Sequence, residues 1–459
     1  MNVPRVLRLV TTILAAACAV TGYAGGAYAA DRVPLIDAVR GADTAAVRAL
    51  IKQRTDVNAA AADGTTALHW ASYRDDVESA TLLIGAGARV NAANDLGATP
   101  LWTASMNGSA VMVRTLLQAG ADPNLALVLG ETPLMAASRS GNSEVVSQLI
   151  DKGANLNARG ARGQTALMWA VSQQHPDVVR ILVARGADIH ARSDKSGQVM
   201  AVPPHGKPEY NRMIPFGDET ALLFAARVGD LESARLLLAA GADVNDADAW
   251  GVSAMVLAAH SGFTEMVEFL LDKGANANAA GPGFTALHEA IMRRDEVMVT
   301  ALLAHGANPN TPLQTWTPER RSSEDFNFAP AIVGATPFWL AARFDEPAVM
   351  RLLVKQGADP LFVLRNEYYV NDYNDRRTQA TTALMAAVGI GGGRAWAQPD
   401  RAERAALMLE TVKLAIELGV DVNAANTDGR TVLDVARASK LEPIVNVLVE
   451  KGATEGKKK

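Results

Sequence analysis

Short apolar runs with helical spacing alternate with polar turns along most of the chain. Residues 134–137 (Leu-Met-Ala-Ala) precede a polar turn at 140–142, and a second apolar run fills 145–150. The apolar positions of the second run recur at helical intervals, which predicts an amphipathic helix. Gly153 follows it, at the place where a left-handed residue commonly ends a helix. The pattern therefore predicts helix–turn–helix units whose apolar faces must be covered by neighbouring units.

The unit repeats at a fixed step of 33 residues. Triplets of the form Thr-Pro-Leu or Thr-Ala-Leu begin, two residues after a glycine, at Thr66, Thr99, Thr132 and Thr165. The threonine hydroxyl can cap the first helix, and Pro or Ala fits the position after the cap. A Gly-Ala-x-x-Asn ending, or a close variant, closes most units, at Asn91, Asn124, Asn157, Asn245, Asn278, Asn310 and Asn423. Such a period indicates a stack of one supersecondary unit.

The triplet in its 33-residue unit resembles the ankyrin-repeat family, and the resemblance covers nearly all of the chain beyond residue 30. It implies an all-α repeat solenoid of stacked helix–turn–helix units joined by β-hairpin-like fingers. About eleven units fit within residues 31–455. The first and last units lack parts of the pattern, as the terminal caps of a solenoid do. Residues 456–459 are interpreted as a solvated basic tail.

Residues 1–29 have the features of a secretory signal peptide. Arg5 and Arg8 precede an apolar stretch at 9–20, and Ala27-Tyr28-Ala29 is a small-x-small cleavage site. We expect cleavage after Ala29 and a periplasmic or secreted protein without a membrane span. A second interpretation stays open, in which residues 14–18 form a lipoprotein box and Cys18 carries a lipid anchor. Cys18 is the only cysteine, so cleavage after Ala29 would leave no thiol.

The composition and net charge of the chain indicate which classes of partner it can bind. Hydrophobic residues make up 49% of the chain, and its formal net charge of −5 becomes −7 once Arg5 and Arg8 leave with the signal peptide. A mildly acidic chain without a basic stripe argues against non-specific binding to nucleic acid or anionic membranes. We therefore expect a protein partner, no nucleic acid, and a monomer.

Three departures from the period predict long fingers. The steps from Thr165 to Thr220, from Thr285 to Thr336 and from Thr336 to Thr382 are 55, 51 and 46 residues, and the extra residues fall in insertions at 193–216, 311–333 and 360–379. Insertions at one point of a repeat project from one face, which is often the binding face. All three are rich in aromatic and arginine side chains, which disordered linkers lack and interface hot spots favour.

These insertions and one further loop supply the candidate partner-binding residues. The fourth departure, the 49-residue step from Thr382 to Thr431, places an insertion at 389–404 between the two helices of one unit, and its glycines predict a flexible loop. The alternative for every aromatic is packing onto neighbouring fingers. The candidates are Tyr210, Arg212, Trp316, Arg320, Arg321, Phe326, Arg365, Tyr368, Tyr369, Tyr373 and Trp396.

The sequence shows no catalytic constellation. The mature histidines are scattered over separate units, and His69 and His288 fill the position after the triplet, where a structural role is expected. The pair His288-Glu289 lacks the second histidine of a zinc-protease helix. We therefore expect no catalytic, cofactor or metal residues. The function predicted is a protein-binding scaffold or adaptor, and three alternatives stay open: an accessory or maturation subunit of an exported enzyme, a secreted effector, and a small-molecule or polysaccharide binder.

Overall fold

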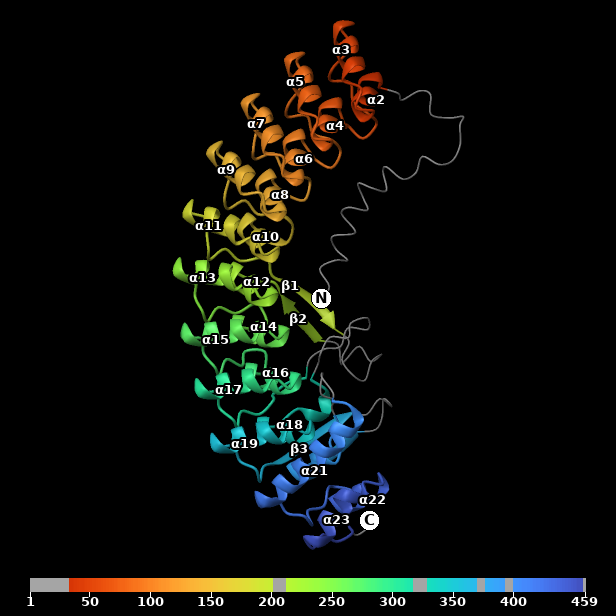
Figure 1. The fold of residues 1–459 in the computed structure, drawn as a ribbon, viewed down its shortest axis with the longest axis vertical. Helices are drawn as coiled ribbons and strands as arrows, with labels where there is room; N and C mark the ends of the chain where they lie inside the picture. Colours follow the sequence, from red (N-terminus) through yellow and green to blue (C-terminus); the bar gives the residue numbers. More distant parts are fainter. Residues whose placement is uncertain (1–32, 201–211, 317–327, 370–375, 393–398, 457–459) are drawn as a thin grey trace, which may run out of the picture. The chain divides into compact units, whose positions relative to one another are not determined.

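The computed structural model of the 459-residue chain describes residues 33–200, 212–316, 328–369, 376–392 and 399–456. The chain divides into two compact units, Met1–Asp194 with Arg235–Gly241 and Lys195–Ala234 with Ala242–Lys459. Helix α13 (Leu231–Ala239) is divided between them. Within each unit, helices pair in chain order and the pairs stack (Figure 1). The described part thus confirms the predicted fold class.

The first unit is made of helix pairs joined by short fingers. Its first helices α4, α6, α8 and α10 pack on one another in sequence, and the second helices α3, α5, α7, α9 and α11 do the same. A short 3₁₀ turn, η1 (Ala161–Gly163), lies in one finger. The bounds are α2 Pro34–Arg40, α3 Thr44–Lys52, α4 Ala67–Tyr73, α5 Val77–Gly85, α6 Pro100–Asn107, α7 Ala110–Gln118, α8 Pro133–Ser140, α9 Ser143–Asp151, α10 Ala166–Ser172 and α11 Pro176–Ala184.

The second unit continues the same pairing and adds two antiparallel hairpins. Strand β1 pairs with β2, and β3 pairs with β4. The helix bounds are α12 Ala221–Val228, α14 Ala254–Ser261, α15 Thr264–Asp272, α16 Ala286–Arg293, α17 Glu296–Ala304, α18 Pro337–Arg343, α19 Pro347–Lys355, α20 Ala383–Ala387, α21 Arg401–Glu417, α22 Val432–Ala438 and α23 Glu442–Glu450. The strands are β1 Ser196–Met200, β2 Arg212–Phe216, β3 Val363–Tyr369 and β4 Arg376–Thr382, and a 3₁₀ turn, η3, spans Pro330–Ile332.

The repeated threonine begins the first helix of its unit as expected. The Thr99 hydroxyl accepts a hydrogen bond from the Trp102 N–H over 3.1 Å, and Thr132 accepts one from Met135 over 3.3 Å. Proline or alanine follows the cap, where a helix needs no N–H donor. The helix that starts at Pro100 ends at Gly108, whose φ of 71° is the left-handed conformation that favours glycine.

Histidine completes this cap at two positions. In α16, the Thr285 N–H donates to His288 Nδ1 over 3.1 Å, so His288 Nε2 carries the proton and donates to the Thr311 carbonyl 3.1 Å away. His69 makes the same contacts in α4, with Thr66 and the Ala98 carbonyl. Each ring therefore ties a helix start to the finger of the next repeat, and the predicted structural role of these histidines is confirmed.

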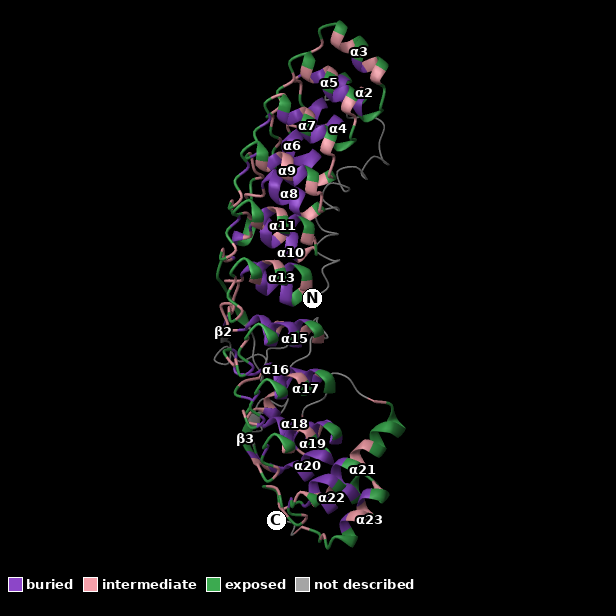
Figure 2. Cartoon of the chain, turned by 60° about the vertical axis from the view of Figure 1, so that its left-hand side comes forward, coloured by how far each residue is buried: buried purple, intermediate pink, exposed green. Residues whose placement is uncertain are grey.

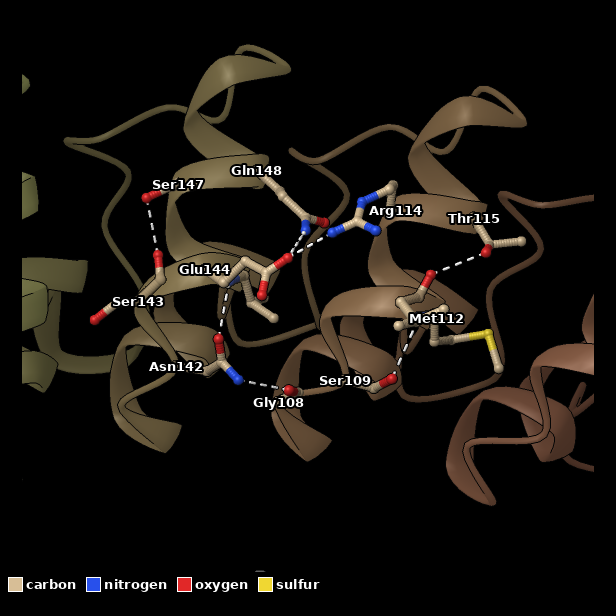
Figure 3. A network of polar contacts seen from close by, with 12 residues as sticks. Gly108, Ser109, Met112, Arg114, Thr115, Asn142, Ser143, Glu144, Ser147 and Gln148 are labelled. Atoms are coloured by element: carbon tan, nitrogen blue, oxygen red, sulfur yellow. Dashed lines mark hydrogen bonds and ion pairs between the residues drawn. The ribbon is translucent and has the colours of Figure 1, made fainter.

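Polar side chains connect successive second helices. Figure 3 shows Asn142, which donates to the Gly108 carbonyl over 2.7 Å, and the ion pair between Arg114 and Glu144 at 2.5 Å. The asparagine of the repeat ending acts similarly, because Asn124 donates to the Gly153 carbonyl over 3.0 Å and accepts from the Asn155 N–H over 2.8 Å. Neighbouring repeats are thus joined at both ends of the helix pair.

Apolar burial lies between consecutive helices (Figure 2). Leu134 and Leu149, from the two helices of one pair, are fully buried, and Trp339 and Phe338 are among the largest side chains with no exposed surface. Burial of a large apolar side chain stabilises by roughly 1.5–3 kcal/mol. The first helix α6 buries six consecutive residues from Pro100 to Ser105, whereas the second helix α7 buries Met112, Val113, Leu116 and Leu117 and leaves Val111 exposed.

Candidate binding surface

The first predicted insertion, 193–216, contains the β1–β2 hairpin. Its register pairs Val199 with Met213, and both side chains are exposed, at 57% and 63%. A Cβ on Gly197 would lie 2.4 Å from Met213 Sδ, so Met213 lies across the neighbouring strand. Ile214, next along β2, is buried at 8%. The alternation of strand side chains therefore anchors one face of the hairpin and presents an apolar pair to solvent.

The third insertion, 360–379, contains most of the β3–β4 hairpin. Leu364 is fully buried. The Asn366 amide donates to the Ala331 carbonyl over 2.8 Å, and Gln379 donates to the same carbonyl over 2.8 Å. Arg365, between these anchors, is exposed. The base of this hairpin is therefore fixed on turn η3, which belongs to the second insertion.

The second insertion, 311–333, packs partly on the fingers. Phe328 is only 1% exposed, and its ring centroid lies 5.2 Å from that of Phe284. Phe284 in turn contacts Trp250 edge-on at 6.0 Å. Aromatic pairs in such arrangements add stability beyond their buried area. For Phe328, which the sequence placed in an aromatic-rich insertion, the alternative of packing on neighbouring fingers is therefore the correct one.

The structure places only some of the predicted binding residues. Arg365 is exposed on β3, and Trp316 is half-buried within the second insertion. Arg212, Tyr368 and Tyr369 are strand residues whose side chains lie outside the described part, so their proposed contacts stay predictions. The remaining candidates lie outside the described residues altogether; they are Tyr210, Arg320, Arg321, Phe326, Tyr373 and Trp396.

The first helices of the first unit carry aromatic and arginine side chains that the sequence reasoning passed over. The Arg40 guanidinium lies 4.7 Å from the ring centre of Trp70, and Trp70 contacts Tyr73 edge-on at 5.8 Å. Arg139 lies 5.3 Å from the ring centre of Trp169. Trp, Tyr and Arg are also the residue types enriched at the hot spots of protein interfaces. The sequence contained a signal for this surface. Trp70 and Trp169 each lie four residues after the threonine of their triplet, and Tyr73 and Arg139 lie seven residues after it.

Arg139 also forms an ion pair with Glu131 of the finger, at 2.8 Å. Both side chains are largely buried, with exposures of 16% and 19%. Burial raises the pKa of the Glu131 carboxyl, and the charge of Arg139 opposes that rise. The opposite charges of Arg139 and Glu131 therefore compensate each other where the finger meets the helix, next to the Trp169 ring.

The predicted flexible loop, 389–404, is described only at its two ends, 389–392 and 399–404, and residues 393–398 lie outside the described part. A Cβ on Gly391 would lie 2.8 Å from the Trp339 ring, and Arg343 Nε donates to the Gly392 carbonyl over 2.6 Å. Helix α21 begins at Arg401, so the last four residues of the predicted loop are helical. The glycines are needed here for close packing, because no larger side chain fits against Trp339.

Two buried acids lie next to this insertion. Asp345 and Glu346, at the turn between α18 and α19, are 2% and 5% exposed. Arg404 Nε lies 3.6 Å from Asp345 Oδ2, and Arg294 donates to the backbone carbonyls of Phe344 and Asp345. Burial raises the pKa of Asp345 to about 6 and that of Glu346 to about 8, while the nearby arginines oppose both shifts. The two carboxyl groups are thus largely closed to solvent, whereas the Arg404 side chain is 44% exposed.

Two features of the described part concern metal ions and membrane spans. Within its ranges, no three His, Cys, Asp or Glu side chains are placed to share a metal ion. Among the same residues, no helix has both the length and the apolar character required to cross a bilayer. The geometry thus offers exposed apolar and aromatic surface on fingers and first helices.

Comparison with known proteins gives the same architecture. A model of ankyrin repeats in three copies matches residues 35–127, 123–193 and 218–312, and a single-repeat ankyrin model matches 333–364. An ankyrin repeat and KH domain-containing protein of Caenorhabditis briggsae is 30% identical over 264 residues, which are 54% of this chain and 9% of that protein. A putative ankyrin repeat-containing protein of Treponema pallidum (strain Nichols) is 41% identical over 90 residues, 19% of this chain and 30% of that protein.

One solved structure aligns with about half of this chain. The crystal structure of the human ASB11 ankyrin repeat domain aligns with 52% of this chain and 98% of its own, at 29% identity and a TM-score of 0.44. The chain spans less than a third of the length of the two curated relatives named above. Ankyrin-repeat models together match more than half of the residues. The chain therefore belongs to the ankyrin-repeat family, whose members generally act as protein-binding scaffolds.

Proposed function

We propose that this chain is an adaptor that binds a partner protein through its fingers and first helices and carries out no chemistry of its own. The observation that carries the proposal is the exposed pair Val199 and Met213 on the inserted β1–β2 hairpin. Two large apolar side chains side by side on a projecting hairpin are costly to leave in water, and such patches mark interaction sites. The repeats behind them form a rigid support, so binding need not order the scaffold.

The proposal places this adaptor outside the cytoplasm, in the periplasm or secreted. Its support is the sequence of residues 1–29, with a positive start, an apolar stretch and the Ala27-Tyr28-Ala29 site. Intact mass of the exported protein tests it. A mature chain beginning at Ala30 agrees with cleavage, a lipidated chain beginning at Cys18 supports the lipid anchor, and a cytoplasmic chain that retains Met1 contradicts export.

The binding role is tested by changing the hairpin alone. The double substitution Val199→Ser, Met213→Ser should abolish capture of the partner from an extract of the source organism, measured by quantitative mass spectrometry. Val111→Ser with Val297→Ser is the matched control, since these apolar residues are 54% and 63% exposed but lie singly on second helices. Equal capture by the hairpin variant and by the unchanged chain would refute the role of the hairpin.

A further inference from the structure

Three large apolar side chains lie together at the tips of two adjacent fingers in the first unit. Leu96 is 55% exposed, Val128 is 74% exposed and Leu129 is 73% exposed. The two fingers are the loops between α5 and α6 and between α7 and α8 (Figure 1). Single exposed apolar residues are ordinary on a protein surface, whereas a contiguous group at a projecting edge calls for a partner.

The two tips are held rigidly against each other. The Val128 N–H donates to the Leu96 carbonyl over 2.9 Å. Gly97 fits between the fingers because it has no side chain, since a Cβ there would lie 2.9 Å from the Ala126 carbonyl oxygen. Asn94 accepts from the Leu96 N–H over 3.1 Å and so fixes the turn. The apolar group is therefore pre-organised, and binding on it loses little conformational entropy.

Charged side chains occupy the tips on either side of this group. The preceding finger ends in Asp63, and Asp95 adjoins Leu96; both are exposed. The following finger carries Arg162, which is exposed at a φ of 61°. Along the stacking direction the row of tips thus changes from acidic, through apolar, to basic. A complementary segment needs basic, then apolar, then acidic side chains in the same order.

The spacing of the fingers favours a helix as that segment. Stacked helices lie about 8–10 Å apart, so successive tips recur at about that distance. An α-helix rises 1.5 Å per residue, so seven residues, close to two full turns, cover about 10.5 Å, near the upper end of this spacing, and bring the same face over the next tip. An extended strand covers the distance in about three residues, and because strand side chains alternate, successive tips would meet opposite faces.

We propose that the fingertip row formed by Asp63, Asp95, Leu96, Val128, Leu129 and Arg162 binds an amphipathic helix of a partner protein. The basic end of the helix lies over the two aspartates, its apolar stripe covers the leucines and the valine, and its acidic end meets the arginine. This inference rests on the proposed function, because it names the kind of segment that the adaptor recognises. It concerns the first unit, whereas the hairpin of the proposed function belongs to the second.

The probe is a displayed library of random peptides of about 20 residues, a length that spans about 30 Å as a helix. The library is selected on the purified chain, and each enriched peptide is then titrated against Leu96→Ser, Val128→Ser, Leu129→Ser. We expect enriched peptides with apolar residues about seven apart between a basic and an acidic end. Their affinity should fall about tenfold or more on the triple variant, because the variant removes all three apolar side chains that the helix would cover.

The orientation is tested by exchanging the charges. Asp95→Lys with Arg162→Glu should weaken the selected peptides and favour versions in which the two charged ends are swapped. Val111→Ser is the control. It should change neither the affinity of the selected peptides nor that of the versions with swapped ends. Lack of enrichment, peptides with strand-like alternation, or affinities unchanged on the triple variant would each overturn the proposal. Peptides that lose binding only with Val199→Ser, Met213→Ser would overturn it while leaving the adaptor function in place.

Discussion

The side-chain amide of Asn310 donates a hydrogen bond to the Gly357 carbonyl, 47 residues further along the chain, over 2.8 Å. In a regular repeat the same bridge, from Asn91 to Gly120, spans 29 residues. The second insertion therefore leaves the joint between repeats intact. It extends the finger without changing the stacking of the helix pairs on either side.

This joint gives the first prediction. Asn310→Ala removes both the bond to Gly357 and the bond that the Asp359 N–H makes to Asn310 Oδ1 over 2.8 Å. We expect a loss of about 1 kcal/mol in stability around this repeat, because both hydrogen bonds are exposed to solvent and such a bond contributes only about 0.5–1.5 kcal/mol net. Native-state hydrogen exchange at the Asp359 amide should become faster.

Leu361 provides the control for Asn310. It lies four residues after Gly357, as Asn310 lies four residues after Gly306, and it is 57% exposed. Leu361→Asn supplies the missing amide and should not weaken that repeat. Unaltered exchange at Asp359 in Asn310→Ala would show that the bridge carries no stability.

A second prediction separates backbone strain from close packing. Gly87 and Gly97 both have positive φ, 90° and 81°, but a Cβ meets nothing within 4 Å at Gly87 and lies 2.9 Å from the Ala126 carbonyl oxygen at Gly97. Gly87→Ala should cost about 1–2 kcal/mol from the left-handed conformation alone. Gly97→Ala should cost more in urea unfolding, since two fingers must also separate. Equal losses would mean that the fingers are not tightly packed there.

The third prediction concerns His288 and acid. Burial lowers the pKa of His288 from 6.5 to about 4. The unfolded chain therefore binds a proton between these values and the folded chain does not, so stability is complete above pH 6.5 and falls as the pH drops toward 4. The change amounts to about 3 kcal/mol. Urea titrations across this range should show the decline.

Methionine provides the control for His288. It fills the same position after the triplet at Met135 and Met168, both buried. His288→Met should keep the fold and lose the part of the acid dependence that His288 causes. An identical pH profile in this variant would contradict the assignment.

The fourth prediction concerns Glu346, for which stability falls as the pH rises rather than as it drops. Burial raises the pKa of Glu346 from 4.5 to about 8, so the folded chain holds a proton that the unfolded chain has lost. The resulting stability is complete below pH 4.5 and is lost as the pH rises through 8. Arg294 opposes the shift, and Asp345 and Glu296 reinforce it. Glu346→Gln should flatten the alkaline decline of the second unit in urea unfolding, and a steeper decline would refute this account.

The repeat pattern predicted those features that depend on neighbouring residues in the sequence. The threonine cap at Thr99 and the left-handed Gly108 follow from local geometry, so each could be predicted from a few residues. The histidine slot could likewise be read as structural, because His69 and His288 recur at one place in the unit. The first and third insertions contain the β1–β2 hairpin and most of the β3–β4 hairpin.

The candidate site was less accessible from sequence. Phe328 and Arg365 both belong to long insertions, yet one is buried against Phe284 and the other is exposed. Composition alone could not separate them, since the outcome depends on which finger lies alongside. Trp70 and Leu96 were passed over because each looks ordinary within its own repeat.

The sequence by itself determined the repeat, its caps and the positions of the insertions, because these follow from local backbone preferences that recur at a fixed step. The tertiary structure alone decided which side chains face outward and which meet across repeats. Val128 touches Leu96 only because two fingers stack, and Gly391 packs on Trp339 only because its insertion folds back. These contacts join residues 32 and 52 positions apart, and they depend on packing, which no local pattern encodes.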